Sequence, residues 1–306
     1  MIAAGCADWE PLLIVYPDKG NYFYETLGRR LAAAATSILS NRDEIVIKPA
    51  SASHELDARW LATSTALVVN PAECALSGSQ GLKRLKRARR RIAVLADQVR
   101  TNWFAIQFDA GLEIDAIFDV GFVPQEHDHP SGVPYVFLYN APLHDEANQI
   151  EKQIPSDRPL TWAVVGHATS ERAALAEDLV EDLGPDGIVF LPSLRPLRAD
   201  SGLLSPGALH RLLSTVSCYV WRSHHRWAYY ESFRFLDAML AGAVPCKIEA
   251  THFKSLAGVP NIYRSVADLG EHLVEIGPES MFEAARQHYL AQGTLGEHLA
   301  RALSRV

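Results

Sequence analysis

The sequence predicts two tandem doubly wound α/β domains. Short apolar segments rich in β-branched residues alternate with helix-patterned segments, and the same alternation starts again after residue 159. The apolar segments are continuous, which is typical of parallel strands covered by helices on both faces. A length of 306 residues also favours two cores over one.

The first half contains the first series of expected elements. Its predicted strands are 12–17, 44–50, 66–72, 91–97, 116–122 and 134–142. Helical patterns lie between them, at YETLGRRLAAAATSILS, HELDARWLA, a basic segment from Gln80 to Arg90, and NWFAIQF. Because helices separate successive strands, right-handed βαβ units are expected.

A polar segment, HDEANQIEKQIPSDRP (144–159), separates the two halves, and its charge, amide and proline content predicts a linker. In the second half, we expect strands at 162–167, 187–192, 217–222 and 243–249, and helices at 170–184, 205–216 and from about 231. Ser170 is a candidate cap for the first of these helices.

The expected domain boundaries follow from this pattern. They are 1–145 for an N-terminal Rossmann-like domain, 160–280 for a C-terminal one, and 281–306 for C-terminal helices, with packing against the first domain as one option. Two such domains are expected to form a crevice at the carboxyl ends of their strands, where doubly wound proteins bind ligands.

Charge, cysteine spacing and hydropathy argue against several classes of protein. A net charge of -7 argues against a protein built wholly to bind nucleic acid. Cys6, Cys74, Cys218 and Cys246 lie far apart, which fits free thiols in a reducing compartment. The opening residues lack the basic start of a signal peptide, and no segment has the roughly 18 apolar residues that span a bilayer. We therefore expect a soluble cytoplasmic protein.

The segment 230-YESFRFLDAMLAGAVPCKIEA-250 begins with three charged residues, Glu231, Arg234 and Asp237, within seven positions of an otherwise apolar run. It follows a predicted strand and opens a helix, the position at which doubly wound domains bind phosphates. Arg234 could donate a fork of hydrogen bonds to a phosphate, and Asp237 could accept the hydroxyls of a ribose. The alternative is an amphipathic helix with a minor surface pair between Glu231 and Arg234.

This segment resembles the donor-site signature of GT-B glycosyltransferases, a helix with the pattern Glu-Ala-Met-Ala-x-Gly-x-Pro-Val. Residues 237–245, DAMLAGAVP, follow that pattern with aspartate in the first position. The order Ser-x-Arg-x-x-Asp-Ala is similar to spore-coat-type and exostosin-like transferases. Five residues separate Glu231 from Asp237, where the common pattern has seven, and the resemblance covers about residues 160–260.

The resemblance implies roles for individual residues. Asp237 would hold the ribose of the nucleotide, and Glu231 would contact hydroxyls of the transferred sugar in a catalytic role. Ser232, Phe233 and Arg234 would face the diphosphate, and Arg172, in GHATSER with His167, lies where the family tends to place a basic residue. Apart from the resemblance, Arg226 lies between a predicted strand and the helix, where it could meet phosphate or sugar or shape the loop.

Three further segments carry candidate residues. Gly20 and Asn21, in the turn after the first strand, would let the backbone approach the diphosphate or sugar, although an ordinary βα turn uses the same residues. His127 and Asp128, in EHDHP, could act as a general base toward an acceptor hydroxyl or form a polar loop.

The third segment is the basic run 83-KRLKRARRR-91, which suits either a solvated face or an anionic surface or acceptor. Its cationic residues are Lys83, Arg84, Lys86, Arg87, Arg89, Arg90 and Arg91.

Together these patterns predict a glycosyltransferase that moves a sugar from a nucleotide-diphosphate sugar to an unknown acceptor. The donor would bind the second domain and the acceptor largely the first. No metal or cofactor is demanded, because cationic side chains can stabilise the leaving diphosphate. The alternatives are a sugar-nucleotide epimerase of the same fold and a non-catalytic polyanion-binding module.

Overall fold

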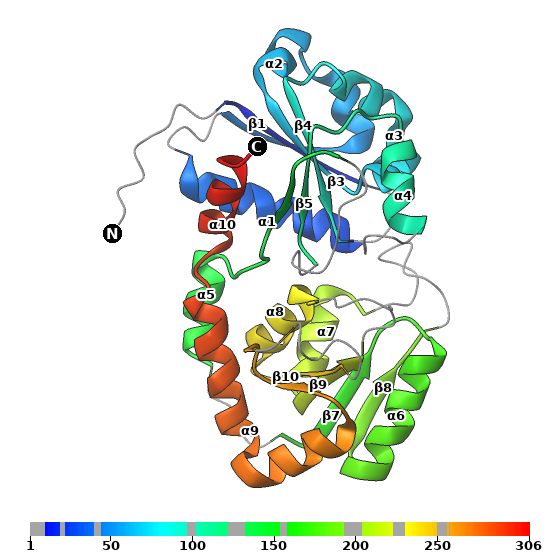
Figure 1. Ribbon diagram of the computed structural model, residues 1–306, viewed down its shortest axis with the longest axis vertical. Helices are drawn as coiled ribbons and strands as arrows, with labels where there is room; N and C mark the ends of the chain where they lie inside the picture. Colours follow the sequence, from blue (N-terminus) through cyan, green and yellow to red (C-terminus); the bar gives the residue numbers. More distant parts are fainter. Residues whose placement is uncertain are drawn as a thin grey trace. The chain divides into compact units, whose positions relative to one another are not determined.

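The computed structural model describes residues 10–18, 22–39, 44–96, 102–121, 132–153, 158–192, 204–222, 230–249, 256 and 258–306. The chain divides into two compact units (Figure 1): Met1–Tyr139 with Leu295–Val306, and Asn140–Thr294. Each unit contains one parallel sheet with helices packed on it. The predicted α/β class with two parallel, Rossmann-like sheets is therefore confirmed.

The first unit has a sheet of six described strands in the order β2-β1-β3-β4-β5-β6. The strands are β1 (Leu12–Tyr16), β2 (Ile45–Pro49), β3 (Thr65–Val69), β4 (Arg90–Leu95), β5 (Ala116–Asp119) and β6 (Tyr135–Phe137). The helices are α1 (Tyr22–Ile38), the 3-10 helix η2 (Ala50–Glu55), α2 (Ala58–Thr63), α3 (Pro71–Leu85), α4 (Asn102–Asp109) and α10 (Leu295–Leu303).

Apolar strands form the core of this unit. Leu13 and Val15 of β1 pack in one buried cluster with residues of η2 and α3. Because successive side chains of a strand point to opposite faces, Leu12 and Ile14 face the other side, where α1 packs on β1. The terminal helix α10 packs on α1. The segment that joins this unit begins at Leu295 rather than at residue 281.

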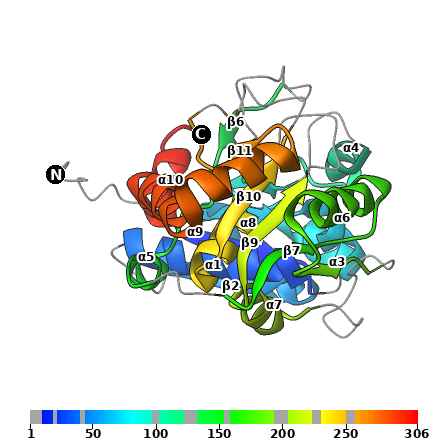
Figure 2. The same cartoon turned by 90° about the horizontal axis from the view of Figure 1, so that it is seen from below.

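The second unit has five described strands in the order β11-β10-β9-β7-β8. They are β7 (Leu160–Val165), β8 (Gly187–Phe190), β9 (Val216–Arg222), β10 (Val244–Ile248) and β11 (Ile262–Tyr263). The helices are α5 (His144–Glu151), α6 (Ser170–Leu183), α7 (Pro206–Leu213), α8 (Ser232–Ala241) and α9 (Val266–Ala291). Helices α6 and α9 pack together on one face of the sheet, and α7 and α8 on the other (Figure 2).

The predicted linker 144–159 is wrong over most of its described length. Residues 144–151 form α5, whose first turn is capped by Glu146. Gln153 donates to the carbonyl of Leu240, and Arg158 donates to the carbonyls that follow it at the end of α8. The polar composition therefore supplies donors for the last carbonyls of a helix, which have no partner inside it.

One predicted helix cap also needs correction. Thr169, not Ser170, caps α6, because its hydroxyl accepts from the amide of Arg172. Element α9 consists of two helical segments that meet at a kink, where Gly277 has a non-helical backbone conformation and Pro278 follows it. Within the described residues, no helix has both the length and the apolar character needed to cross a membrane.

Candidate functional site

The second sheet has a topological switch point between β7 and β9. The chain passes from β7 to β8 on one side and then returns to place β9 on the other side of β7. Ligands of doubly wound proteins bind outside the carboxyl ends of the strands at such a point. Here β7 ends at Val165, and α8 follows β9 and begins after Glu231. The motif predicted from the sequence therefore opens the helix next to the switch point.

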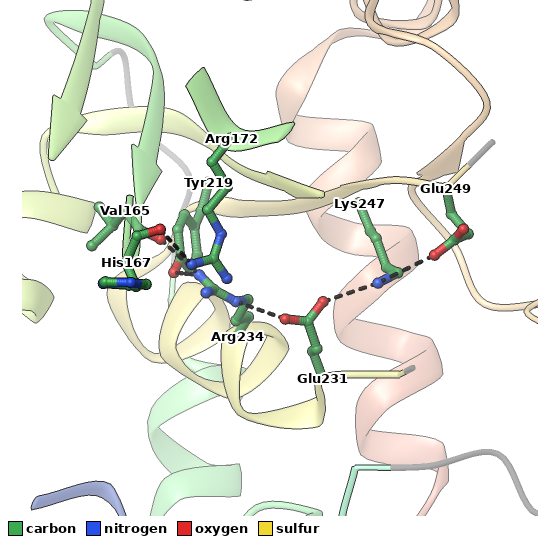
Figure 3. Close-up of polar contacts among 8 residues, drawn as sticks. All are labelled: Val165, His167, Arg172, Tyr219, Glu231, Arg234, Lys247 and Glu249. Carbon is green, nitrogen blue, oxygen red and sulfur yellow. Dashed lines mark hydrogen bonds and ion pairs between the residues drawn. The ribbon is translucent and has the colours of Figure 1, made fainter. Parts of the chain in front are cut away.

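Arg234, in the first turn of α8, bridges the two strands at this point (Figure 3). Its Nη1 donates to the carbonyl of Val165 on β7 at 2.9 Å and to the hydroxyl of Tyr219 on β9. Its Nε donates to Oε1 of Glu231 at 3.2 Å. Among the described residues, none accepts a hydrogen bond from Nη2. Burial alone would lower the pKa of Arg234, but Tyr219 and Glu231 raise it above its ordinary value, so the guanidinium stays charged.

A second guanidinium, that of the buried Arg172, lies beside the first. Arg172, in the first turn of α6, donates from Nη1 to the carbonyl of His167 at 2.8 Å. A Cβ on Gly166 would lie 2.8 Å from Nη1 of Arg172 and 3.2 Å from Nη2 of Arg234, so a side chain here would displace the guanidiniums. Burial, and then the charge of Arg234, lower the pKa of Arg172 to about 10. An anion would stabilise these two neighbouring cations.

Glu231 is a buried carboxylate in a left-handed backbone conformation (φ 53°, ψ 47°), and its side chain does not cap α8. For a residue other than glycine, this conformation costs about 1–2 kcal/mol. Its Oε2 accepts a hydrogen bond from Nζ of Lys247 at 2.9 Å, while Oε1 accepts from Arg234. Burial alone would raise the pKa of Glu231, but the charges of Lys247 and Arg234 lower it to about 2. The pair joins a buried carboxylate to a partly buried guanidinium, so the alternative of a minor surface pair is wrong.

Lys247 and Glu249, on and just after β10, extend this network. Lys247 is fully buried, and its Nζ lies 3.6 Å from Oε2 of Glu249. Cations and carboxylates thus alternate from Arg234 through Glu231 and Lys247 to Glu249 (Figure 3). Sequence reasoning misses Lys247, Glu249 and Tyr219. The available signal is a lysine inside an apolar predicted strand, because a buried lysine requires a partner.

The remaining motif residues lie along α8. Ser232 is buried and Phe233 half-buried in the first turn, and Asp237 is half-buried one turn beyond Arg234. The helix ends at Gly242, which adopts a left-handed conformation as a C-terminal cap. The expected placement of the motif at the start of a helix is confirmed, whereas the binding roles stay predictions.

Several predicted site residues lie outside the described residues. They are Gly20, Asn21, His127, Asp128 and Arg226.

The first sheet has its own switch point, between β1 and β3. At the start of α3, Asn70 accepts from the amide of Glu73 at 3.1 Å, and Gln107 accepts from the amide of Ala72 at 3.0 Å. These two amides are therefore engaged by side chains of the protein. The described residues at this switch point therefore leave fewer hydrogen-bond donors for an anion than those of the second unit.

The basic run 83–91 is not one helix. Helix α3 ends at Leu85, and β4 begins at Arg90 because Arg90 and Arg91 pair with β3. Four of its cationic side chains make contacts within the first unit: Arg84 with the carbonyl of Leu56, Arg89 with Glu10, Arg90 with the carbonyl of Val306, and Arg91 with Asp115. Four of the seven cationic residues in the predicted basic patch therefore bind other parts of the first unit.

No protein-family model and no curated protein matches this sequence. Within the described part of the chain, no group of three or more His, Cys, Asp or Glu side chains is arranged to hold a metal ion. The chemistry of the site follows from its own geometry. Two guanidiniums beside a glycine suit an anion, and an ionised carboxylate beside them suits a ligand that also carries hydroxyl groups.

Proposed function

We propose that this protein is a GT-B-type glycosyltransferase whose second unit binds a nucleotide-diphosphate sugar. The observation that carries the proposal is the pair of guanidiniums beside Gly166 at the switch point, which belong to the buried Arg172 and the partly buried Arg234. The second support is the motif itself, which resembles a glycosyltransferase donor site and opens α8 at this position.

The electrostatics of the site favour a diphosphate. Arg172 has its pKa lowered to about 10 by burial and then by the charge of Arg234, so bringing an anion to this point relieves the repulsion between the two cations. Guanidinium groups bind phosphate oxygens through paired N–H donors. The same two groups would stabilise the charge that develops on a leaving nucleoside diphosphate.

The two acids of the motif fit different parts of the donor. Glu231, with a pKa of about 2, is ionised at neutral pH, so it can accept hydrogen bonds from sugar hydroxyls but does not serve as a general acid. Asp237 stands one turn further along α8, and we propose that it accepts the ribose hydroxyls. We also propose a cytoplasmic location, which suits the free buried thiols of Cys74, Cys218 and Cys246.

The proposal is tested with a panel of nucleotide sugars and with UDP, GDP, ADP, CDP and dTDP. We expect at least one diphosphate to bind by calorimetry and its sugar conjugate to release it when an acceptor is present. Arg234→Met should weaken binding of that diphosphate about 10- to 100-fold, because a charged hydrogen-bond donor is lost. Arg211→Met, an exposed arginine on α7 of the same unit, should leave the affinity unchanged.

The other outcomes are distinct. An altered nucleotide sugar without released diphosphate would indicate the epimerase. If no diphosphate binds and a long polyanion binds equally to wild type and Arg234→Met, the protein is the polyanion-binding module.

A further inference from the structure

We propose that Lys247 is a positioning residue for the diphosphate site. Its buried ammonium holds one carboxylate oxygen of Glu231, so that the other oxygen fixes the guanidinium of Arg234 with Nη2 toward Gly166. This inference rests on the proposed function and adds to it a residue outside the motif.

The sheet fixes the position of Lys247. On β10 it is paired with Trp221 of β9 on one side and with Ile262 of β11 on the other. Its side chain is fully buried, so burying the ammonium has a large cost that only close partners offset. Those partners are Oε2 of Glu231 at 2.9 Å and Oε2 of Glu249 at 3.6 Å. The ammonium is therefore a rigid anchor for a carboxylate.

Glu231 needs such an anchor. It sits in a left-handed conformation at the start of α8, and its side chain makes no bond that would cap the helix. The carboxylate instead bridges Lys247 and Arg234, one oxygen to each. On the far side, the Nη1 of Arg234 is held by Val165 and Tyr219. The guanidinium is thus fixed on two sides, and Nη2 is the edge that remains for a phosphate oxygen.

Removing the ammonium should change the protonation of Glu231. The charged and titratable described groups that act on this carboxylate or on its partners are Arg172 of α6, Tyr219 of β9, Arg234 and Asp237 of α8, and Lys247 and Glu249 at β10. Without Lys247, burial is opposed chiefly by the two arginines, so the pKa of Glu231 should rise toward the working pH. A protonated Glu231 would no longer hold Arg234 as an ion pair.

The test compares Lys247→Met, Glu231→Gln and the double variant, with Lys152→Met, an exposed lysine of the same unit, as the control. The first measurement is calorimetric binding of inorganic pyrophosphate, and of each diphosphate named above, from pH 8 to pH 5. We expect Lys247→Met to bind about tenfold more weakly than wild type at pH 8 and to weaken further as the pH falls. Lys152→Met should match wild type at every pH.

The double variant covers the case in which Lys247→Met alone does not fold. It removes both members of the buried pair, which is far less costly than leaving one charge unpaired. If Lys247 acts through Glu231, the double variant and Glu231→Gln should bind pyrophosphate equally well. A further loss of binding in the double variant would overturn the proposal.

The second measurement needs no ligand. Infrared difference spectra between pH 7 and pH 4 should show an additional protonated carboxyl band in Lys247→Met, beyond the bands of the carboxylates that titrate alike in wild type and the double variant. If wild type binds no diphosphate, the proposed function is refuted, and this band still shows whether Lys247 controls Glu231. If the band is absent from Lys247→Met, the positioning role is refuted even when diphosphates bind.

Discussion

The acid stability of the second unit should depend on one carboxylate, Glu231. Its folded-state pKa is about 2, against an ordinary value of 4.5. A lowered pKa means that the folded protein binds the proton less tightly than the unfolded chain does. The resulting stability is present above about pH 4.5 and is lost as the pH falls toward 2.

The size of this effect follows from the shift. Each pKa unit corresponds to about 1.4 kcal/mol, so Glu231 contributes on the order of 3 kcal/mol to the free energy of unfolding at neutral pH. The carboxylate is buried and held by Lys247 and Arg234, so solvent screens these interactions little. About 2 kcal/mol of the contribution should be lost between pH 7 and pH 3.

The assay is urea unfolding of wild type and Glu231→Gln at pH 7, 5, 4 and 3, with amide exchange of β10 peptides to report on the second unit. Other carboxylates titrate alike in both proteins, so the difference in unfolding free energy isolates Glu231. This difference should shrink by about 2 kcal/mol from pH 7 to pH 3. Glu181→Gln, an exposed residue on α6, should show no such trend. A wild-type minus Glu231→Gln difference that stays constant across this range would refute the reasoning.

Two further substitutions test the ligand side of the site. Gly166→Ala places a methyl group 2.8 Å from Nη1 of Arg172, so we expect about tenfold weaker pyrophosphate binding by calorimetry, whereas Gly207→Ala, whose Cβ meets nothing closer than 3.7 Å, should bind normally. Asp237→Asn should weaken nucleoside diphosphate binding while leaving both pyrophosphate binding and the melting temperature nearly unchanged, and Asp182→Asn on α6 should change none of them. Equal losses of pyrophosphate and nucleoside diphosphate binding in Asp237→Asn would contradict the ribose role.

Most of the fold was predictable because its signals are local. Continuous apolar strands, helical patterns between them and capping residues lie within a few positions of one another, so the two α/β series can be recognised from the sequence. The largest error concerned a segment whose structure depends on contacts with residues far away in the sequence. The segment 144–159 looked like a linker because its amides and charges are polar. Gln153 and Arg158 instead cap the end of α8, whose last carbonyls lie more than 80 residues further along the chain.

The candidate site likewise contains residues that the sequence identifies and contacts that only the folded structure reveals. Glu231, Arg234 and Asp237 could be selected from the sequence because they stand close together in one helix-opening segment. The contacts of Lys247 with Glu231 and of Tyr219 with Arg234 could not be predicted in this way. Lys247 and Tyr219 lie on two different strands, and each meets the motif only after the strands have paired. Local patterns therefore established the α/β class and the position of the motif. Tertiary packing alone decided which charges neutralise one another, because the strength of an ion pair depends on burial and on the distance between residues remote in the chain.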